Sequence, residues 1–357
     1  MTSALGGVSR RVRTLAVSGA LFVVLLILTM TLPVPYVVLS PGPTCNTLTT
    51  CPGETATIIK VTGTRTLHTS GNLNLTTVSY STSRLTVFDA LRAWIAHDRV
   101  VVPQSALFPP GQTTQQVNTQ NKNDFTSSQD NAIVAASCEL GYPKAFGVLT
   151  VIGKGPSDGI LEPGDVFRSI DGKPAGTYRQ LKGILVGERP GARVRVVVRR
   201  NSSPTQSSVK TLTVTLGKPP QGATGASLGI TVPPAPVCLA PFQVQLGLND
   251  EIGGPSAGTM FALGIIDKVS QDLTRGRFIA GTGTISSDGT VGPIGGIALK
   301  MIAARDAGAT VFLAPAGNCG DVAGNIPDGL KVVKVSTLHG AVTALQNLAK
   351  GKPVPAC

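Results

Sequence analysis

The feature that most constrains the fold is a glycine-rich turn that leads directly into a long apolar run. The turn reads Gly253-Gly254-Pro255-Ser256-Ala257-Gly258, and the uncharged run behind it extends to Ile266. Glycine and proline favour a tight turn, and the apolar run predicts a buried helix that ends before Asp267 and Lys268. A serine at the start of such a helix lies beside free backbone N–H groups, which suit either a helix cap or an oxyanion.

Lys300 is a candidate partner for this serine. A serine hydroxyl is a weak nucleophile at neutral pH, and a lysine can act as its base only when the amine is uncharged. Lys300 stands among glycine, isoleucine, alanine, leucine and methionine residues. Burial in such surroundings lowers the pKa of a lysine, so the two residues are a candidate nucleophile and general base. The alternative is that Ser256 only caps a helix and that Lys300 lies in solvent.

The order and spacing of these pieces resemble the proteolytic domain of Lon proteases. After the serine turn come Thr282-Gly283 and then Pro293-Ile294-Gly295-Gly296, with Lys300 four residues beyond the second glycine. The resemblance implies that Ser256 is the nucleophile, that Lys300 is the general base and that Thr282 orients the lysine, although Thr282 fits an ordinary strand nearly as well. It also implies that the backbone amide of Ser256 and its immediate neighbours stabilises an oxyanion, with Gly254, Pro255 and Ala257 as supporting residues.

The chain also departs from the Lon pattern. Gly253 stands where Lon has an acidic residue, and the nearby Asp250 and Glu251 are displaced in sequence, while Thr284 stands where Lon commonly has Glu. No phosphate-binding loop or dinucleotide fingerprint is complete, so we expect no ATPase motor and no cofactor. Metal-ligand spacing is absent as well, because the histidines lie far apart, at His68, His97 and His339.

A second recognisable unit precedes this region. A strand pattern at Gly147–Ile152 is followed by a Gly-Asp-apolar turn at Gly164-Asp165-Val166 and a second turn at Asp171-Gly172. This order resembles a bacterial PDZ domain, whose helix would run from Tyr178 to Val186. PDZ domains bind an extended peptide as an added strand, so the resemblance implies a peptide groove beside that helix, although such a module can also serve only as a packing unit. The groove residues would be Phe146, Gly147, Val148, Leu149 and Thr150.

The N-terminus predicts a membrane anchor. Arg10, Arg11 and Arg13 precede an uncharged apolar stretch of 18 residues, 15–32, which is just long enough to span a bilayer. No small-residue cleavage motif follows, so an uncleaved anchor is favoured over a removed signal peptide. The arginines predict a cytoplasmic N-terminus, with the remainder of the chain outside the membrane.

Cysteine usage agrees with an oxidising compartment. The even number of cysteines, all on the predicted outer side, favours a disulfide framework, although some could be free buried thiols. Cys45 with Cys51 is the simplest pair, and we favour Cys138 with Cys238 and Cys319 with Cys357 among the remaining pairings.

Composition and pattern describe the rest of the chain. Only 14% of the residues are charged and the net charge is +12, but no basic stretch is interleaved with aromatics, so we expect no nucleic-acid partner. A helix over Thr86–Ile95 is expected to place Trp94 in a core. The polar residues 103–123 are expected to form a mobile loop, and a further helix to run from about Ser127 to Leu140.

Together these patterns predict an α/β (α+β multidomain) chain with four segments: a tip and anchor at 1–35, a mixed segment at 36–143, a PDZ domain at 144–218 and a Lon-like domain at 219–357. This order resembles the membrane-anchored PDZ and Lon-like proteases of Gram-positive bacteria. The resemblance implies an ATP-independent, extracytoplasmic serine endopeptidase acting on peptides or unfolded proteins, with homo-oligomer formation left open. The alternative is a non-catalytic surface adhesin or adaptor on the same folds.

Overall fold

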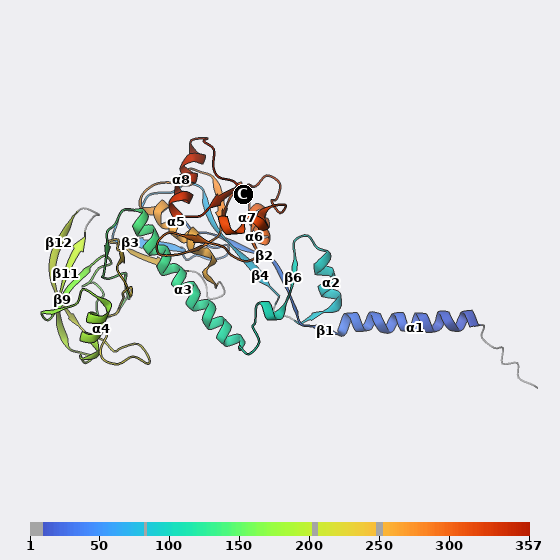
Figure 1. Ribbon diagram of the computed structural model, residues 1–357, viewed down its shortest axis with the longest axis horizontal. Coiled ribbons are helices and arrows are strands. Elements are labelled where there is room, and N and C mark those ends of the chain that lie inside the picture. Colours follow the sequence, from blue (N-terminus) through green and yellow to red (C-terminus); the bar gives the residue numbers. More distant parts are fainter. Residues whose placement is uncertain (1–9, 82–83, 202–205, 248–252) are drawn as a thin grey trace, which may run out of the picture. The chain divides into compact units, whose positions relative to one another are not determined.

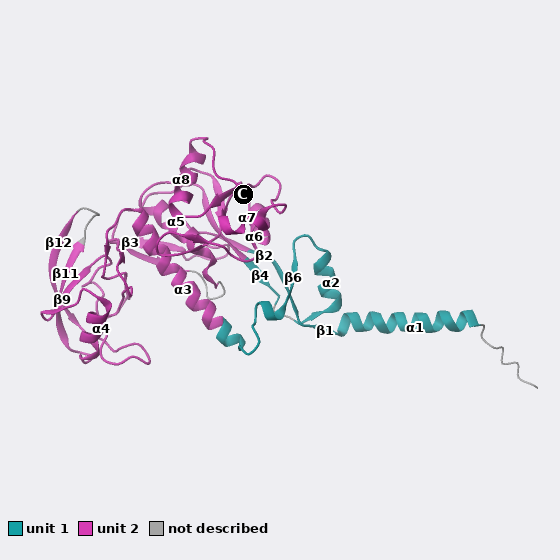
Figure 2. Ribbon diagram, viewed as in Figure 1, with its two compact units in different colours: residues 1–42, 78–117 teal, residues 43–77, 118–357 magenta. Residues whose placement is uncertain are grey.

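The computed structural model describes residues 10–81, 84–201, 206–247 and 253–357 (Figure 1). The chain divides into two compact units (Figure 2). Unit 1 comprises residues 1–42 and 78–117, and unit 2 comprises residues 43–77 and 118–357. The boundaries between these units differ from the boundaries of the four segments expected from the sequence. The bounds of those four segments stay predictions.

Unit 1 begins with the apolar helix α1 (Arg10–Thr31), none of whose residues is buried. In the described part of the chain, α1 is the one helix long and apolar enough to cross a membrane. Strand β1 (Pro33–Val34) pairs antiparallel with β5 (Leu85–Thr86), and β6 (Val100–Pro103) pairs with the first residues of β2 (Tyr36–Asn46). The short turn η1 (Gln104–Ala106) follows β6.

Helix α2 (Val87–Ile95) shows why the expectation for Trp94 was wrong. Thr86 caps the helix with its side chain, and Asp89 completes the capping box. Only Ala93 of this helix is buried, whereas the Trp94 side chain is 77% exposed. The periodicity correctly predicted an amphipathic helix, but the core of unit 1 is small and buries only one side of this helix, at Ala93. That core consists of Val38, Leu85 and Ala93 with Val34 and Val101 packed against them.

Helix α3 (Thr114–Glu139) begins well before the position expected for it, because residues 114–123 are helical rather than loop. The Gln116 side chain accepts the backbone N–H of Thr113 at 2.8 Å, and the Thr113 hydroxyl accepts the N–H of Gln116 at 3.2 Å. This reciprocal cap starts the helix without any apolar periodicity. Burial is confined to the C-terminal half, from Ser128 onward.

The PDZ-like module in unit 2 is built on a four-stranded antiparallel sheet with the order β10-β9-β11-β12. Its helix α4 (Tyr178–Val186) has the bounds expected from the sequence, and Thr177 caps it. The module has its own core, which includes Val148, Phe167 and Leu181. The strands are β9 (Val166–Ile170), β10 (Lys173–Pro174), β11 (Arg193–Asn201) and β12 (Ser207–Thr215).

The C-terminal region of unit 2 is an α/β layer structure around a parallel sheet. Strands β4, β16, β19 and β20 lie side by side, and each neighbouring pair is parallel. Alternate strand residues face opposite sides. Ile279 and Leu313 pack in the same core as α5 and α8, whereas Ala280 and Phe312 pack with α6 and α7. The bounds are β4 (Asn72–Tyr80), β16 (Phe278–Gly281), β19 (Val311–Pro315), β20 (Lys331–Val335), α5 (Gly258–Val269), α6 (Ile297–Asp306), α7 (Cys319–Val322) and α8 (Leu338–Ala349).

Small two-stranded ladders and three disulfides complete unit 2. The disulfides join Cys45 to Cys51, Cys138 to Cys238 and Cys319 to Cys357. These are the pairs favoured above, and their formation in the protein stays a prediction for chemical mapping. The ladders pair β3 (Ile59–Thr62) with β15 (Gln243–Leu246), β7 (Lys144–Ala145) with β14 (Val237–Cys238), β8 (Thr150–Val151) with β13 (Ile230–Thr231) and β17 (Thr284–Ile285) with β18 (Val291–Gly292).

Candidate active site

Three side chains meet at the carboxyl end of strand β16. Thr282 directly follows this strand, Ser256 precedes helix α5, and Lys300 belongs to helix α6. Since α5 and α6 cover opposite faces of the sheet, their residues can meet only beyond a strand end. Carboxyl ends of parallel strands are where open α/β sheets place ligands.

Ser256 lies in the short turn η2 (Pro255–Ala257), which precedes α5 rather than forming its first turn. Gly254 adopts a φ of 85° at the entry of this turn, a conformation that favours glycine. The expected end of the helix was wrong, because α5 continues through Asp267 and Lys268 to Val269. Asp267 is fully buried and its carboxylate accepts the backbone N–H of Leu273 at 2.7 Å, which lets an acidic residue stay inside the helix.

The Lys300 amine is enclosed and lies between two hydroxyls. Its Nζ lies 2.8 Å from Oγ of Ser256 and 3.0 Å from Oγ1 of Thr282. Lys300 is only 3% exposed, and this burial lowers its pKa from 10.5 to about 8. Among the residues that the structure describes, no carboxylate forms an ion pair with this amine. Desolvation of the ammonium form is therefore the cause of the shift.

Thr282 connects the turn that carries Ser256 to the lysine. Its hydroxyl donates to the carbonyl oxygen of Ser256 at 3.0 Å and accepts from Nζ of Lys300. The same carbonyl accepts the N–H of Gly283 at 2.9 Å. The backbone of Ser256 is thus held from the end of β16, and its hydroxyl is left to face the amine.

The turn around Ser256 places backbone N–H groups at the start of a helical segment. The N–H groups of the first turn of a helical segment have no acceptor within it, and Ser256 and Ala257 occupy that turn in η2. Gly254 and Pro255 shape its entry, as the resemblance implies. Gly253 is exposed, and Asp250 and Glu251 lie outside the described residues.

Helix α3 supports this turn, which the sequence did not indicate. The Ser128 hydroxyl donates to the carbonyl oxygen of Pro255 at 2.9 Å, and Gly254 N–H donates to the carbonyl oxygen of Asn121 at 3.2 Å. A Cβ on Gly258 would lie 2.6 Å from the Ser128 hydroxyl, so glycine is required there. These contacts join residues more than a hundred positions apart, so no local pattern predicts them. The one local signal in this region is the cap at Thr113, which indicates the start of α3.

The expected PDZ groove residues lie on a strand that is paired along both edges. On one edge, Val148 N–H donates to the carbonyl oxygen of Asp165 at 2.8 Å. On the other edge, Leu149 N–H donates to Thr231 at 2.9 Å, and Ile152 N–H donates to Gly229 at 3.0 Å. Phe146, Gly147, Val148 and Leu149 are buried and Thr150 is half-buried.

The segment that closes this edge also contacts the helix of the module. Ala226 N–H donates to the carbonyl oxygen of Leu185 in α4 at 2.9 Å, and Leu228 is only 1% exposed in the core of the module. Residues 226–231 thus bond to α4 and to the strand edge at Leu149–Ile152. Residues 226–231, which follow the expected end of the PDZ domain at residue 218, fold back onto the module and occupy the expected groove.

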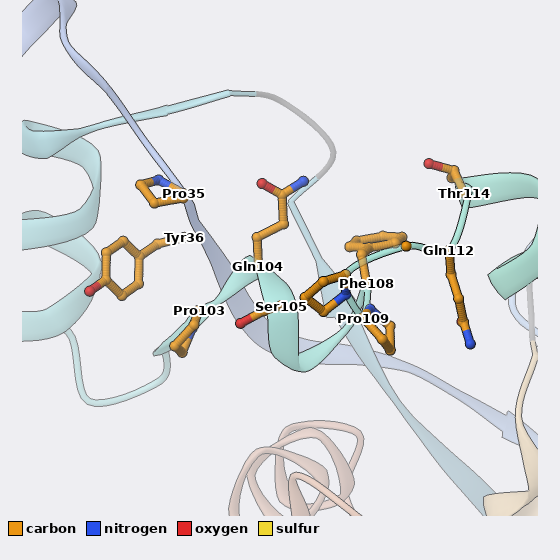
Figure 3. Close-up of a pocket in the computed structure, with 11 residues that line it drawn as sticks. Pro35, Tyr36, Pro103, Gln104, Ser105, Phe108, Pro109, Gln112 and Thr114 are labelled. Atoms are coloured by element: carbon orange, nitrogen blue, oxygen red, sulfur yellow. The ribbon is translucent and has the colours of Figure 1, made fainter.

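Another hollow lies in unit 1 (Figure 3). It has a volume of about 540 Å³, and its wall is formed mainly by proline, glutamine and aromatic residues. None of its lining residues is acidic, basic or a cysteine, so the lining holds no general base that would activate the hydroxyls of Ser105 or Thr114. The lining residues include Pro35, Tyr36, Pro103, Gln104, Ser105 and Phe108.

Comparison with known proteins connects the C-terminal region to one family. Residues 251–347 match the family model of the Lon protease (S16) C-terminal proteolytic domain. Lon protease 2 of Bacillus subtilis is 40% identical over 91 residues, 25% of this chain and 16% of that protein. The archaeal Lon protease of Methanothermobacter thermautotrophicus is 35% identical over 105 residues, 29% of this chain and 16% of that protein. The chain therefore spans a small fraction of the curated relatives it matches.

Among solved structures, the PDZ domain of an SdrC-like protein from Listeria monocytogenes shares 18% identity with this chain. The match covers 25% of this chain and 86% of that one, with a TM-score of 0.22. At this score the likeness carries no weight, and the description of the module rests on its own strand order and helix.

Proposed function

We propose that this chain, which contains a Lon protease C-terminal proteolytic domain in residues 251–347, is a serine endopeptidase with Ser256 as nucleophile and Lys300 as general base. The observation that carries the proposal is the 2.8 Å separation of Nζ and Oγ around a lysine that is 3% exposed. A structural lysine has no need of such burial, whereas a base must be uncharged at working pH.

The reaction follows from the geometry. Neutral Lys300 takes the proton from Oγ of Ser256 as that oxygen attacks a peptide carbonyl carbon. The carbonyl oxygen becomes an oxyanion, which the N–H groups of the η2 turn stabilise. Lys300 then gives the proton to the leaving amine, and an acyl-Ser256 ester remains. A water molecule attacks this ester while Lys300 accepts its proton. Lys300 then returns that proton to Oγ of Ser256 as the acyl–oxygen bond breaks, which releases the carboxylic acid and restores both residues.

The pKa of Lys300 makes this role feasible near neutral pH. With a pKa of about 8, roughly one molecule in ten has a neutral amine at pH 7. Thr282 accepts one N–H of this amine, which directs the lone pair of the neutral form towards the Ser256 hydroxyl. Gly253, in place of an acidic residue, adds no carboxylate that would raise the pKa again.

We further propose that α1 anchors the protein in a membrane and that unit 2 acts outside the cytoplasm, without ATP. The support is the length and exposure of α1, the arginines at its start and an even number of cysteines, six, which suits disulfide pairing in an oxidising compartment. Peptides and already unfolded proteins fit such an enzyme as substrates, since they need no motor to expose their backbone.

For the PDZ-like module we propose a gate rather than an open docking groove. Residues 226–231 take the place that an added peptide strand would occupy. A peptide must displace them in order to bind there. The chain continues from this segment through β14 and β15 to the turn that carries Ser256, and we propose that displacement of the segment acts on the active site through these two strands.

The test is cleavage of an unfolded protein by the full-length chain, with and without ATP. Cleavage independent of ATP is expected, and Ser256→Ala and Lys300→Ala should each abolish it. Unchanged activity in both variants would refute the assignment of the two residues. A chain that binds unfolded protein without cleaving it would favour the surface-binding alternative.

A further inference from the structure

Large exposed apolar side chains gather on one helix of unit 1. On α2, Phe88 is 46% exposed, Leu91 49%, Trp94 77% and Ile95 74%. Scattered exposed apolar residues are normal, but four large ones on a nine-residue helix indicate a surface that binds a partner or a membrane.

These four side chains form a single face, which we call the α2 apolar face: Phe88, Leu91, Trp94 and Ile95. At 3.6 residues per turn they fall within an arc of about 120°. Ala93, which packs in the core of unit 1, lies outside that arc. Arg92 lies about 40° and Asp89 about 100° beyond the Phe88 end of the arc, between the apolar face and Ala93, and both are exposed. Thus α2 has a buried edge, an exposed apolar face and a charged edge, the arrangement of an interfacial membrane helix.

The position of α2 identifies what covers this face. Helix α2 contacts both α1 and β1, and Figure 1 shows it beside the end of α1 that leads into β1. A bilayer crossed by α1 therefore reaches its surface next to α2. Tryptophan is enriched at this depth, where its ring meets both acyl chains and headgroups. The charges around the helix nearly balance, with Arg84, Arg92 and Arg99 against Asp89 and Asp98, so burial of the apolar face supplies the attraction to the bilayer.

We propose that α2 lies in the interfacial layer of the phospholipid bilayer that α1 crosses, on the side of the C-terminal end of α1, with its apolar face among the acyl chains. This inference rests on the membrane anchoring proposed above. It gives unit 1 a second, independent attachment to the membrane and fixes its rotation about α1.

The single tryptophan of the chain allows a direct test, because all tryptophan fluorescence comes from Trp94. The full chain is reconstituted in vesicles of phosphatidylcholine with a minority of phosphatidylglycerol. Phosphatidylcholine brominated on the upper acyl chain should quench about half of the emission or more, since interfacial helices insert by about 5–10 Å. An emission spectrum of a water-exposed indole, quenched by acrylamide but not by bromine, would overturn the proposal.

Flotation of the vesicles separates this inference from the anchor. A chain that floats but whose Trp94 is not quenched by bromine refutes the lipid contact and leaves the anchor intact. A chain that does not float refutes both. Trp94 that is protected from acrylamide yet unaffected by bromine would mean that protein covers the face, which also overturns the proposal.

Substitutions on the face provide the matched comparison. Leu91→Gln combined with Ile95→Gln should reduce bromine quenching several-fold without unfolding unit 1, because both side chains are exposed. Val209→Gln changes another exposed apolar residue, 62% exposed in β12, and should leave quenching unchanged. Equal quenching in both variants would show that the apolar face does not set the depth of Trp94, contrary to the proposal.

Discussion

At the scale of single residues, the chemistry depends on how Lys300 is buried. Its amine is removed from water, and its two described hydrogen-bond partners, the hydroxyls of Ser256 and Thr282, are uncharged. Such surroundings destabilise the ammonium form without replacing its hydration by a counter-charge. These surroundings suit the general base that we propose better than they suit one half of a salt bridge.

The pH dependence of cleavage follows from this burial. Because only the neutral amine accepts the serine proton, kcat/KM should rise about tenfold per pH unit below the pKa and level off above about 8. A pH–rate profile of the full-length chain on an unfolded substrate measures this. A profile that is already flat between pH 6 and 7, or that falls towards pH 8, would contradict a lysine base.

Burial of Lys300 should also cost stability. Its pKa is lower in the folded chain, about 8, than in the unfolded one, 10.5. The unfolded state thus binds more protons between these values, so stability rises with pH across that window and the full cost applies below pH 8. This cost is at most about 3 kcal/mol. Lys300→Met should raise the free energy of unfolding at pH 7 by about 1–3 kcal/mol while abolishing cleavage.

Denaturant unfolding at pH 7 measures this gain, with Lys331→Met as the comparison because Lys331 is exposed on β20. That variant should change stability by less than about 0.5 kcal/mol. If Lys300→Met proves less stable than the parent chain, burial of Lys300 imposes no charge penalty, and the proposed cause of its low pKa is wrong.

At the scale of elements, helix α3 holds the turn that carries Ser256 through hydrogen bonds to Pro255 and Gly254. Ser128→Ala removes the hydroxyl that donates to Pro255, a bond worth about 1 kcal/mol. We therefore expect kcat to fall by about threefold to tenfold with KM nearly unchanged. Steady-state kinetics on one peptide substrate measures both constants.

Ser137→Ala is the control for this substitution. Ser137 is also buried on α3, but its hydroxyl donates to Ile133 within the same helix. Both variants should lose similar stability, and only Ser128→Ala should lose kcat. An equal loss of kcat in the two would mean that α3 affects catalysis only through overall stability.

The segment that closes the PDZ-like edge gives a second element-scale prediction. A Cβ on Gly225 would overlap the carbonyl oxygen of Leu185, so Gly225→Ala should push this segment away from α4. If the segment is a gate, cleavage of a short peptide should increase several-fold.

Gly222→Ala is the matched control, because Gly222 has a similar positive φ but no atom within 4 Å of its would-be Cβ. Its peptide cleavage should stay at the parental rate. Reduced cleavage by Gly225→Ala, together with a lower melting temperature, would instead identify the segment as a structural strand of the module.

At the scale of the whole molecule, the sequence predicted the features that local patterns determine better than the features that depend on long-range contacts. The α/β class followed from the alternation of strand and helix patterns, and the bounds of α4 and the order of the site residues followed from the resemblance to PDZ and Lon motifs. What failed depended on distant partners. Trp94 was expected inside because periodicity gives the direction of a helix face but not the size of the core it meets. The PDZ edge was expected open because the strand that closes it, Ile230–Thr231, lies some eighty residues away.

The residues of the site also differ in how well the sequence predicted them. Ser256, Thr282 and Lys300 were expected from motifs, and the structure brings their side chains within hydrogen-bond distance. Asn121 and Ser128 were missed because they belong to a helix with no motif and a polar first half. Their contribution lies in a few hydrogen bonds to the turn, which only the folded chain reveals.

The central claim is that Ser256 forms a covalent acyl intermediate. Intact-mass analysis of the full-length chain during turnover of a peptide ester, followed by peptide mapping, tests it most directly. The expected result is one acyl group, mapped to Ser256 and absent from Ser256→Ala and Lys300→Ala. An acyl group on another residue, or steady cleavage with Ser256 replaced, would contradict the account.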